Sequence, residues 1–137
     1  MNDEALAVLE TVAAPGNLAA VTSFARAHCA APGQDTAPLD LIVEEVFLNI
    51  ATHACPDQPV RIACSSPSSL EFIYGGPAFD PTTDVPPPPD LDAPSVTGRR
   101  IGGLGVFLVC QLAESVVYRR DGDLNRLAVR VRPQSSP

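Results

Sequence analysis

The chain has 137 residues, an apolar fraction of 45% and a formal net charge of −7, which favours one globular domain over a disordered or fibrous chain. Its nine basic residues are all arginine, and the acidic balance argues against direct binding to nucleic acid or to an anionic membrane. No apolar run is long enough to span a bilayer, the start has no signal-peptide pattern, and the four cysteines form no C-x-x-C pair, so the expected compartment is the cytoplasm.

The first part of the chain predicts one strand followed by two helices. Residues 5–13 form the strand, which Pro15-Gly16 ends, and Asn17 is an N-cap for a helix over residues 18–30. A second helix is predicted over residues 38–54 because its apolar residues recur at helical spacing. These residues are Leu39, Ile42, Val43, Val46, Phe47, Ile50 and Ala54.

The middle of the chain predicts two strands and a long loop. The strands span residues 60–65 and 70–74, and a Pro-Ser-Ser turn separates them. Residues 75–100 contain four consecutive prolines and cannot form regular structure. Most loops in a compact domain are much shorter, so this loop is either functional or disordered.

The last part of the chain predicts a short helix, from just after Gly105 to near Ala113, and a closing hairpin. The hairpin strands span residues 115–120 and 124–132, with Asp121-Gly122 at the turn. Because strands and helices do not alternate strictly, we expect an α/β (α+β) two-layer sandwich in which helices pack on one face of a mixed sheet. The sequence shows no second domain, so residues 1–137 are expected to form a single one.

Three polar residues of the second predicted helix form a column at the edge of its apolar stripe. Glu45, Asn49 and His53 are spaced at i, i+4 and i+8. A carboxylate can accept a proton or orient a water molecule, and an amide oxygen suits Mg²⁺, a hard cation that prefers oxygen ligands. Taken alone, the column is better explained as a solvated flank of the helix that borders the core.

Two glycine-containing stretches flank the long loop. Gly102-Gly103-Leu104-Gly105 opens a helix, and backbone N–H groups at such a helix start suit a phosphate group. Arg99 and Arg100 precede it and are placed to clamp that phosphate. Taken alone, it is also consistent with a flexible loop, and the earlier stretch at residues 75–81 is consistent with a plain turn.

These pieces occur together and in an order that resembles a known family. Residues 44–54, Glu-Glu-Val-Phe-Leu-Asn-Ile-Ala-Thr-His-Ala, resemble the N box of the anti-sigma-factor serine/threonine kinase branch of the GHKL (Bergerat-fold) ATPases. Residues 76–81 are similar to the first glycine box of that branch, and residues 101–109 to the second. The end of the chain, with residues 117–120 followed by residues 125–127, is similar to the closing hairpin of that branch.

The resemblance implies a Bergerat ATP-binding fold, with ATP and Mg²⁺ between the N-box helix and a lid loop at about residues 76–101. Asn49 would be the metal ligand, and Glu45 would be the catalytic base that takes the proton from a serine hydroxyl on a partner protein. The implied nucleotide-binding residues are Asn49, His53, Gly76, Arg100, Gly102, Gly103, Leu104 and Gly105.

The same resemblance implies an ATP-dependent serine/threonine protein kinase that regulates transcription. Its partners would be a sigma factor and an anti-sigma-factor antagonist, which is the protein it phosphorylates, and members of this type are often homodimers. The sequence does not identify which partner, sigma factor or stimulus is involved.

One position departs from the family pattern and keeps an alternative open. The family normally carries an Asp just before the first Gly of its first glycine box, and that carboxylate accepts a hydrogen bond from the adenine amino group. Gly75 stands there, preceded by Tyr74. A lost hydrogen bond to a charged acceptor costs roughly 1.5–3 kcal/mol. The alternative is a non-catalytic GHKL-fold module that sequesters a sigma factor or another regulator without ATP turnover, and Gly75→Asp is expected to restore the acceptor.

Overall fold

The computed structural model describes residues 7–31, 33–65, 68–83 and 109–132. No helix in these ranges is long and apolar enough to cross a membrane. A short helical segment at residues 109–112 leads into the fourth strand. The other elements, in chain order, are β1 (Ala7–Val12), η1 (Pro15–Asn17), α1 (Leu18–Cys29), α2 (Ala37–Asn49), η2 (Ile50–Ala54), β2 (Pro59–Ser65), β3 (Ser69–Tyr74), β4 (Ala113–Asp121) and β5 (Leu124–Val131).

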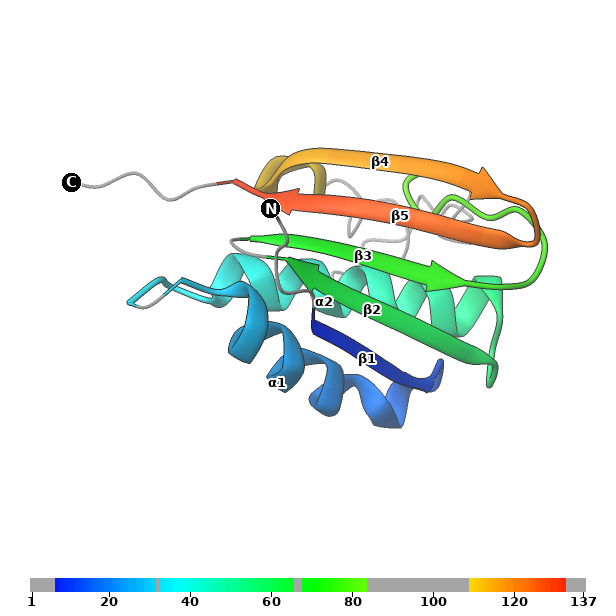
Figure 1. Cartoon of the computed structure of the whole chain (residues 1–137), viewed down its shortest axis with the longest axis horizontal. Helices are drawn as coiled ribbons and strands as arrows, with labels where there is room; N and C mark the ends of the chain where they lie inside the picture. Colours follow the sequence, from blue (N-terminus) through cyan, green and yellow to red (C-terminus); the bar gives the residue numbers. More distant parts are fainter. Residues whose placement is uncertain (1–6, 32, 66–67, 84–108, 133–137) are drawn as a thin grey trace, which may run out of the picture.

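The five strands form one sheet in the order β1-β2-β3-β5-β4 (Figure 1). The α+β class predicted from the sequence is confirmed, but the expected mixed sheet is wrong for the described strands, because every pairing is antiparallel. The physical reason lies in the connections. One crossover helix returns the chain for a parallel strand, whereas α1 and α2 together bring it to β2 in the opposite direction. A tight turn at residues 122–123 then sets the antiparallel pairing of β4 with β5.

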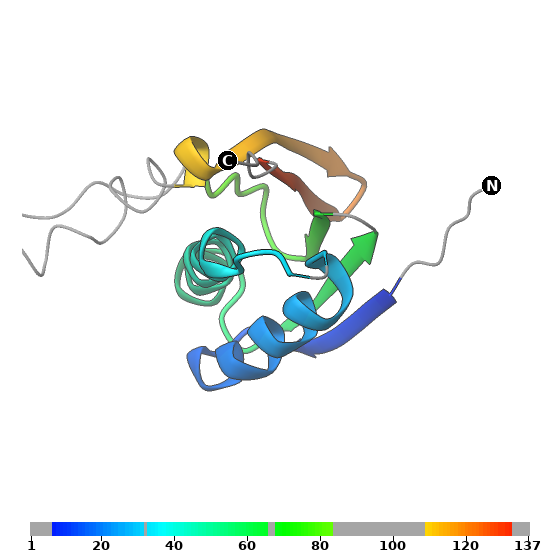
Figure 2. The same cartoon turned by 90° about the vertical axis from the view of Figure 1, so that its left-hand side faces the viewer.

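Both helices cover the same face of the sheet, as Figure 2 shows. The apolar stripe of α2 is buried against this face, and Ile42, Val43 and Phe47 have no exposed surface. Alternate residues of β5, including Leu127 and Val129, supply the opposing side. Fully burying such side chains contributes about 1.5–3 kcal/mol each. The predicted core face of the second helix is therefore confirmed.

The second helix changes its hydrogen bonding near its end. It is α-helical only to Asn49, and Ile50–Ala54 form a π-helical turn. The backbone N–H of Cys55 donates to the carbonyl oxygen of Ile50 over 3.1 Å, five residues back. A π-helical turn inserts an extra residue into the helical repeat, and such turns are frequent at functional sites. The sequence predicted one uniform helix here.

Asn17 is at the predicted N-cap position of α1 but does not cap the helix with its side chain. Its amide nitrogen instead donates to the carbonyl oxygen of Val12 over 2.9 Å. The bond ties the start of α1 back to the end of β1.

Candidate functional site

Glu45 and Asn49 lie one turn apart on a half-buried flank of α2. Residues at this spacing share one side of a helix, with about 5–6 Å between their Cβ atoms. Within the described residues the Asn49 amide makes no hydrogen bond. A half-buried amide without an internal partner keeps its oxygen available for a ligand. The predicted pair is therefore brought together.

His53 lies in η2, beyond the α-helical part of the column. Because a π-helical turn spaces residues differently around the helix axis, His53 does not continue the line of Glu45 and Asn49 at the expected spacing. Its ring stacks with that of Phe79, with the centroids 6.2 Å apart and the planes at 26°. This contact joins the predicted N box to the predicted first glycine box.

Gly76 has a structural reason to be glycine. Its φ is +83°, a region that L side chains rarely adopt, and a Cβ there would lie 3.2 Å from the carbonyl oxygen of Ala54. The carbonyl oxygen of Gly76 also accepts a 2.8 Å hydrogen bond from Arg120 Nη1. Gly76 thus lets the first glycine box pack closely against the end of η2.

Asn125 is a buried hydrogen-bonding centre that sequence reasoning missed. Its side chain has no exposed surface. Its Oδ1 accepts from the Phe79 N–H over 2.9 Å and from the Tyr118 hydroxyl over 2.6 Å. Its Nδ2 contacts three carbonyl oxygens, those of Tyr74, Gly75 and Pro77, at 2.9–3.2 Å. The available signal was alternation, because Asn125 shares the buried face of β5 with Leu127.

Tyr74 ends β3 on the side of the sheet that faces the helices. It is 1% exposed, and its hydroxyl donates to the carbonyl oxygen of Phe79 over 2.7 Å. Side chains alternate along a strand, and the burial of Leu70 and Phe72 sets the same face. The Tyr74 ring therefore lies in the layer between the sheet and α2.

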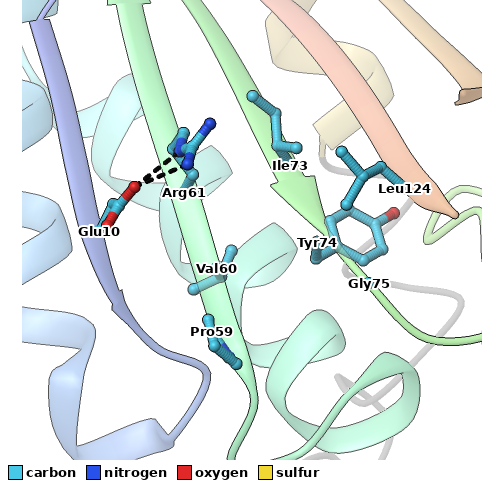
Figure 3. A pocket seen from close by; sticks show the side chains of 8 residues that line it. All are labelled: Glu10, Pro59, Val60, Arg61, Ile73, Tyr74, Gly75 and Leu124. Carbon is cyan, nitrogen blue, oxygen red and sulfur yellow. Dashed lines mark hydrogen bonds and ion pairs between the residues drawn. The ribbon is translucent and has the colours of Figure 1, made fainter.

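Gly75 is directed away from that layer. It lines a shallow depression of about 230 Å³ together with Glu10, Arg61 and Leu124 of the open face, and Tyr74 borders the same depression (Figure 3). A Cβ at Gly75 would meet no atom within 4 Å. The sequence placed the missing carboxylate at position 75, but position 74 is the one whose side chain enters the helix-facing layer. This corrects the expectation for Gly75→Asp.

The side chains of this site fit the Mg²⁺–phosphate end of Mg²⁺-ATP but not its adenine end. Mg²⁺ usually takes one or two protein groups and completes its shell with phosphate and water. The Asn49 amide beside the Glu45 carboxylate fits that role, and the described residues contain no cluster of three or more His, Cys, Asp or Glu side chains. At the base end, the phenol of Tyr74 stands where an acidic acceptor is expected, so the adenine contact is not supported.

Several predicted nucleotide-binding residues lie outside the described residues. They are Arg100, Gly102, Gly103, Leu104 and Gly105, together with most of the predicted lid. Their roles stay predictions.

The open face of the sheet carries the large apolar side chains that are exposed in the described part of the chain. They are Val8, Val12, Val117 and Leu124. Charged residues lie between them and pair on the same face, including Arg61 with Glu10 and Arg126 with Glu71. Arg130 also pairs with Glu114.

A family model described as the histidine kinase-like ATPase domain matches residues 11–131. The match extends from the end of β1 to the end of β5 and therefore includes both helices and the closing hairpin. Domains of this kind bind ATP, generally with Mg²⁺. A comparison with curated proteins finds no match. On the extent of the family match and the agreement of the fold, the chain belongs to the histidine kinase-like ATPase (GHKL) domain family.

Proposed function

We propose that the chain is a serine/threonine protein kinase of the anti-sigma-factor type, which uses Mg²⁺-ATP to phosphorylate a regulatory protein. The observation that supports this proposal is the pairing of Glu45 and Asn49 on one half-buried flank of α2. A general base and a metal ligand that lie one helical turn apart suit phosphoryl transfer to a hydroxyl group.

The two side chains would divide the work. The Asn49 amide oxygen would hold Mg²⁺, which neutralises phosphate charge when bound with the nucleotide. The Glu45 carboxylate would take the proton from the serine hydroxyl of the partner protein as that oxygen becomes the nucleophile. The glycine-rich stretch at residues 102–105 would supply backbone N–H groups to the phosphates.

Asn49→Ala should weaken Mg²⁺-dependent nucleotide binding by about ten-fold or more, because the cation loses its amide ligand. The measurement is isothermal titration of ATP in Mg²⁺ buffer and again in EDTA. Asn17→Ala is the matched control, since it removes an amide at the start of α1 that already has a backbone partner. Equal Mg²⁺-dependent affinity in Asn49→Ala and wild type would count against this metal site.

A specific observation favours a second candidate, the non-catalytic module that sequesters a sigma factor or another regulator. Tyr74 is buried and hydrogen-bonded at the base end of the site. If the chain binds no nucleotide, Tyr74 is simply part of the hydrophobic core. If it does bind nucleotide, Tyr74 alters how the base end is recognised. Thermal unfolding with and without millimolar Mg²⁺-ATP separates the two, because a ligand that binds only the folded state raises the melting temperature.

For partners, we propose a sigma factor and an anti-sigma-factor antagonist in the cytoplasm, and a homodimer formed through the open face of the sheet. The exposed apolar side chains support that face, as does its charge balance. Four arginines and four acidic residues lie along it, so it is neutral in a chain of net charge −7. They are Arg61, Arg119, Arg126 and Arg130 with Glu10, Glu71, Glu114 and Asp121.

Val117→Asp should shift the chain from dimer to monomer, because it places a charge at an apolar position that is 56% exposed in the single chain. Light scattering after size exclusion measures the mass. Ser23→Asp, on the exposed side of α1, is the control and should leave the mass unchanged. A wild type that is monomeric at high concentration, or a Val117→Asp variant that remains dimeric, would contradict the proposed interface.

A further inference from the structure

We infer that this chain recognises the Mg²⁺–triphosphate part of a nucleotide and does not select adenine, because Tyr74 fills the place from which the base would be read. The inference rests on the proposed nucleotide-dependent function and defines its substrate class as nucleoside triphosphates irrespective of base.

Tyr74 offers a neutral phenol at the base end, in place of a carboxylate. The adenine amino group needs a hydrogen-bond acceptor. The Tyr74 hydroxyl donates to the Phe79 carbonyl oxygen over 2.7 Å, and its own oxygen is a neutral acceptor on a residue that is only 1% exposed. The carbonyl oxygens of Tyr74, Gly75 and Pro77 all accept from Asn125 Nδ2. A carboxylate accepts such a bond more strongly than these neutral oxygens, which already take part in the hydrogen bonds around Asn125.

The Tyr74 ring is also held in position. It belongs to the main apolar core and is 1% exposed. Its partner Phe79 is fixed on two sides, by the hydrogen bond from its N–H to Asn125 and by the stacked ring of His53. Swinging Tyr74 out for a base would leave the Phe79 carbonyl without this bond and break close packing, which opposes base entry.

The phosphate end does not depend on this cluster. Asn49 and Glu45 lie one and two turns before His53 on the same helical segment, and neither takes part in the hydrogen bonds around Asn125. Loss of nucleobase recognition therefore leaves intact both Asn49, the proposed metal ligand, and Glu45, the proposed general base. The expected outcome is nucleotide binding that depends on Mg²⁺ and on the phosphates but not on the identity of the nucleobase.

The test is isothermal titration of the wild-type chain in Mg²⁺ buffer with ATP, GTP and inorganic tripolyphosphate. Affinities that agree within a few-fold support the inference. ATP affinity that exceeds both others by about ten-fold or more would overturn it, since that is the effect of one hydrogen bond to the base. Absence of binding by all three overturns the proposed function as well, so the two failures are distinguishable.

Matched variants locate the effect at position 74. Tyr74→Asp should raise ATP affinity over GTP and tripolyphosphate by about ten- to a hundred-fold. Gly75→Asp adds the same carboxylate on the open face and should give no such gain. Tyr74→Phe keeps the ring and should remain base-independent. A gain in Gly75→Asp would contradict the assignment, and if Tyr74→Asp does not fold, the wild-type, Gly75→Asp and Tyr74→Phe titrations still decide it.

Discussion

Glu45→Gln should lower the rate of phosphoryl transfer by about 10²–10⁴-fold, the usual contribution of a positioned general base. Gln keeps the size of the side chain and its ability to hydrogen-bond but cannot take the proton from the attacking hydroxyl. Because Asn49 is unchanged, Mg²⁺-dependent nucleotide binding should stay close to that of the wild type. Release of phosphate from Mg²⁺-ATP measures the rate with water in place of the serine hydroxyl, and isothermal titration measures the affinity.

The neighbouring acidic residue offers a matched control. Glu44 is also half-buried on α2, but adjacent helical residues are rotated away from each other and do not face the same site. Glu44→Gln removes the same charge and should retain the wild-type rate. An equal loss of rate in the two variants, or a loss of nucleotide binding in Glu45→Gln alone, would contradict the role of Glu45 as the base.

Asn125→Ala should lower the free energy of unfolding by about 3 kcal/mol or more. The substitution leaves the Phe79 N–H without its acceptor and three carbonyl oxygens without their donor, and each buried unsatisfied group costs about 1–3 kcal/mol. Part of this loss is relieved by water or small movements, which is why the sum is not simply additive. Urea unfolding followed by circular dichroism measures the change.

Asn17→Ala is the comparison for this experiment. It also removes an amide that donates to a backbone carbonyl, but the bond is exposed, so the expected loss is about 1 kcal/mol or less. A decrease for Asn125→Ala no larger than that for Asn17→Ala would show that the cluster around Asn125 does not stabilise the fold as described.

The order of elements could be predicted from the sequence because it depends on local patterns. The apolar spacing from Leu39 to Phe47 identified the buried side of α2, and alternation along β5 identified its buried face. The antiparallel pairing of all strands could not be read in this way. It depends on how α1 and α2 return the chain to the sheet, which is a non-local property.

The same distinction applies to the candidate site. Glu45 and Asn49 were placed together correctly, since one regular helix carries both. His53 was expected on the same helical column as Glu45 and Asn49, because no local sequence pattern indicates the π-helical turn at Ile50–Ala54. The family resemblance alone puts the missing carboxylate at position 75, because the direction of the side chains at positions 74 and 75 depends on where β3 ends. Asn125 meets residues about fifty positions away, and no local pattern shows such a bond.

The proposed function depends above all on α2 holding a Mg²⁺–triphosphate group through Asn49. Isothermal titration of the wild-type chain with ATP, in Mg²⁺ buffer and then in EDTA, tests it most directly. We expect saturable binding below millimolar nucleotide in Mg²⁺ that is lost in EDTA, because the metal of such a site is shared with the phosphates. No binding in Mg²⁺, or the same affinity in EDTA, would contradict it.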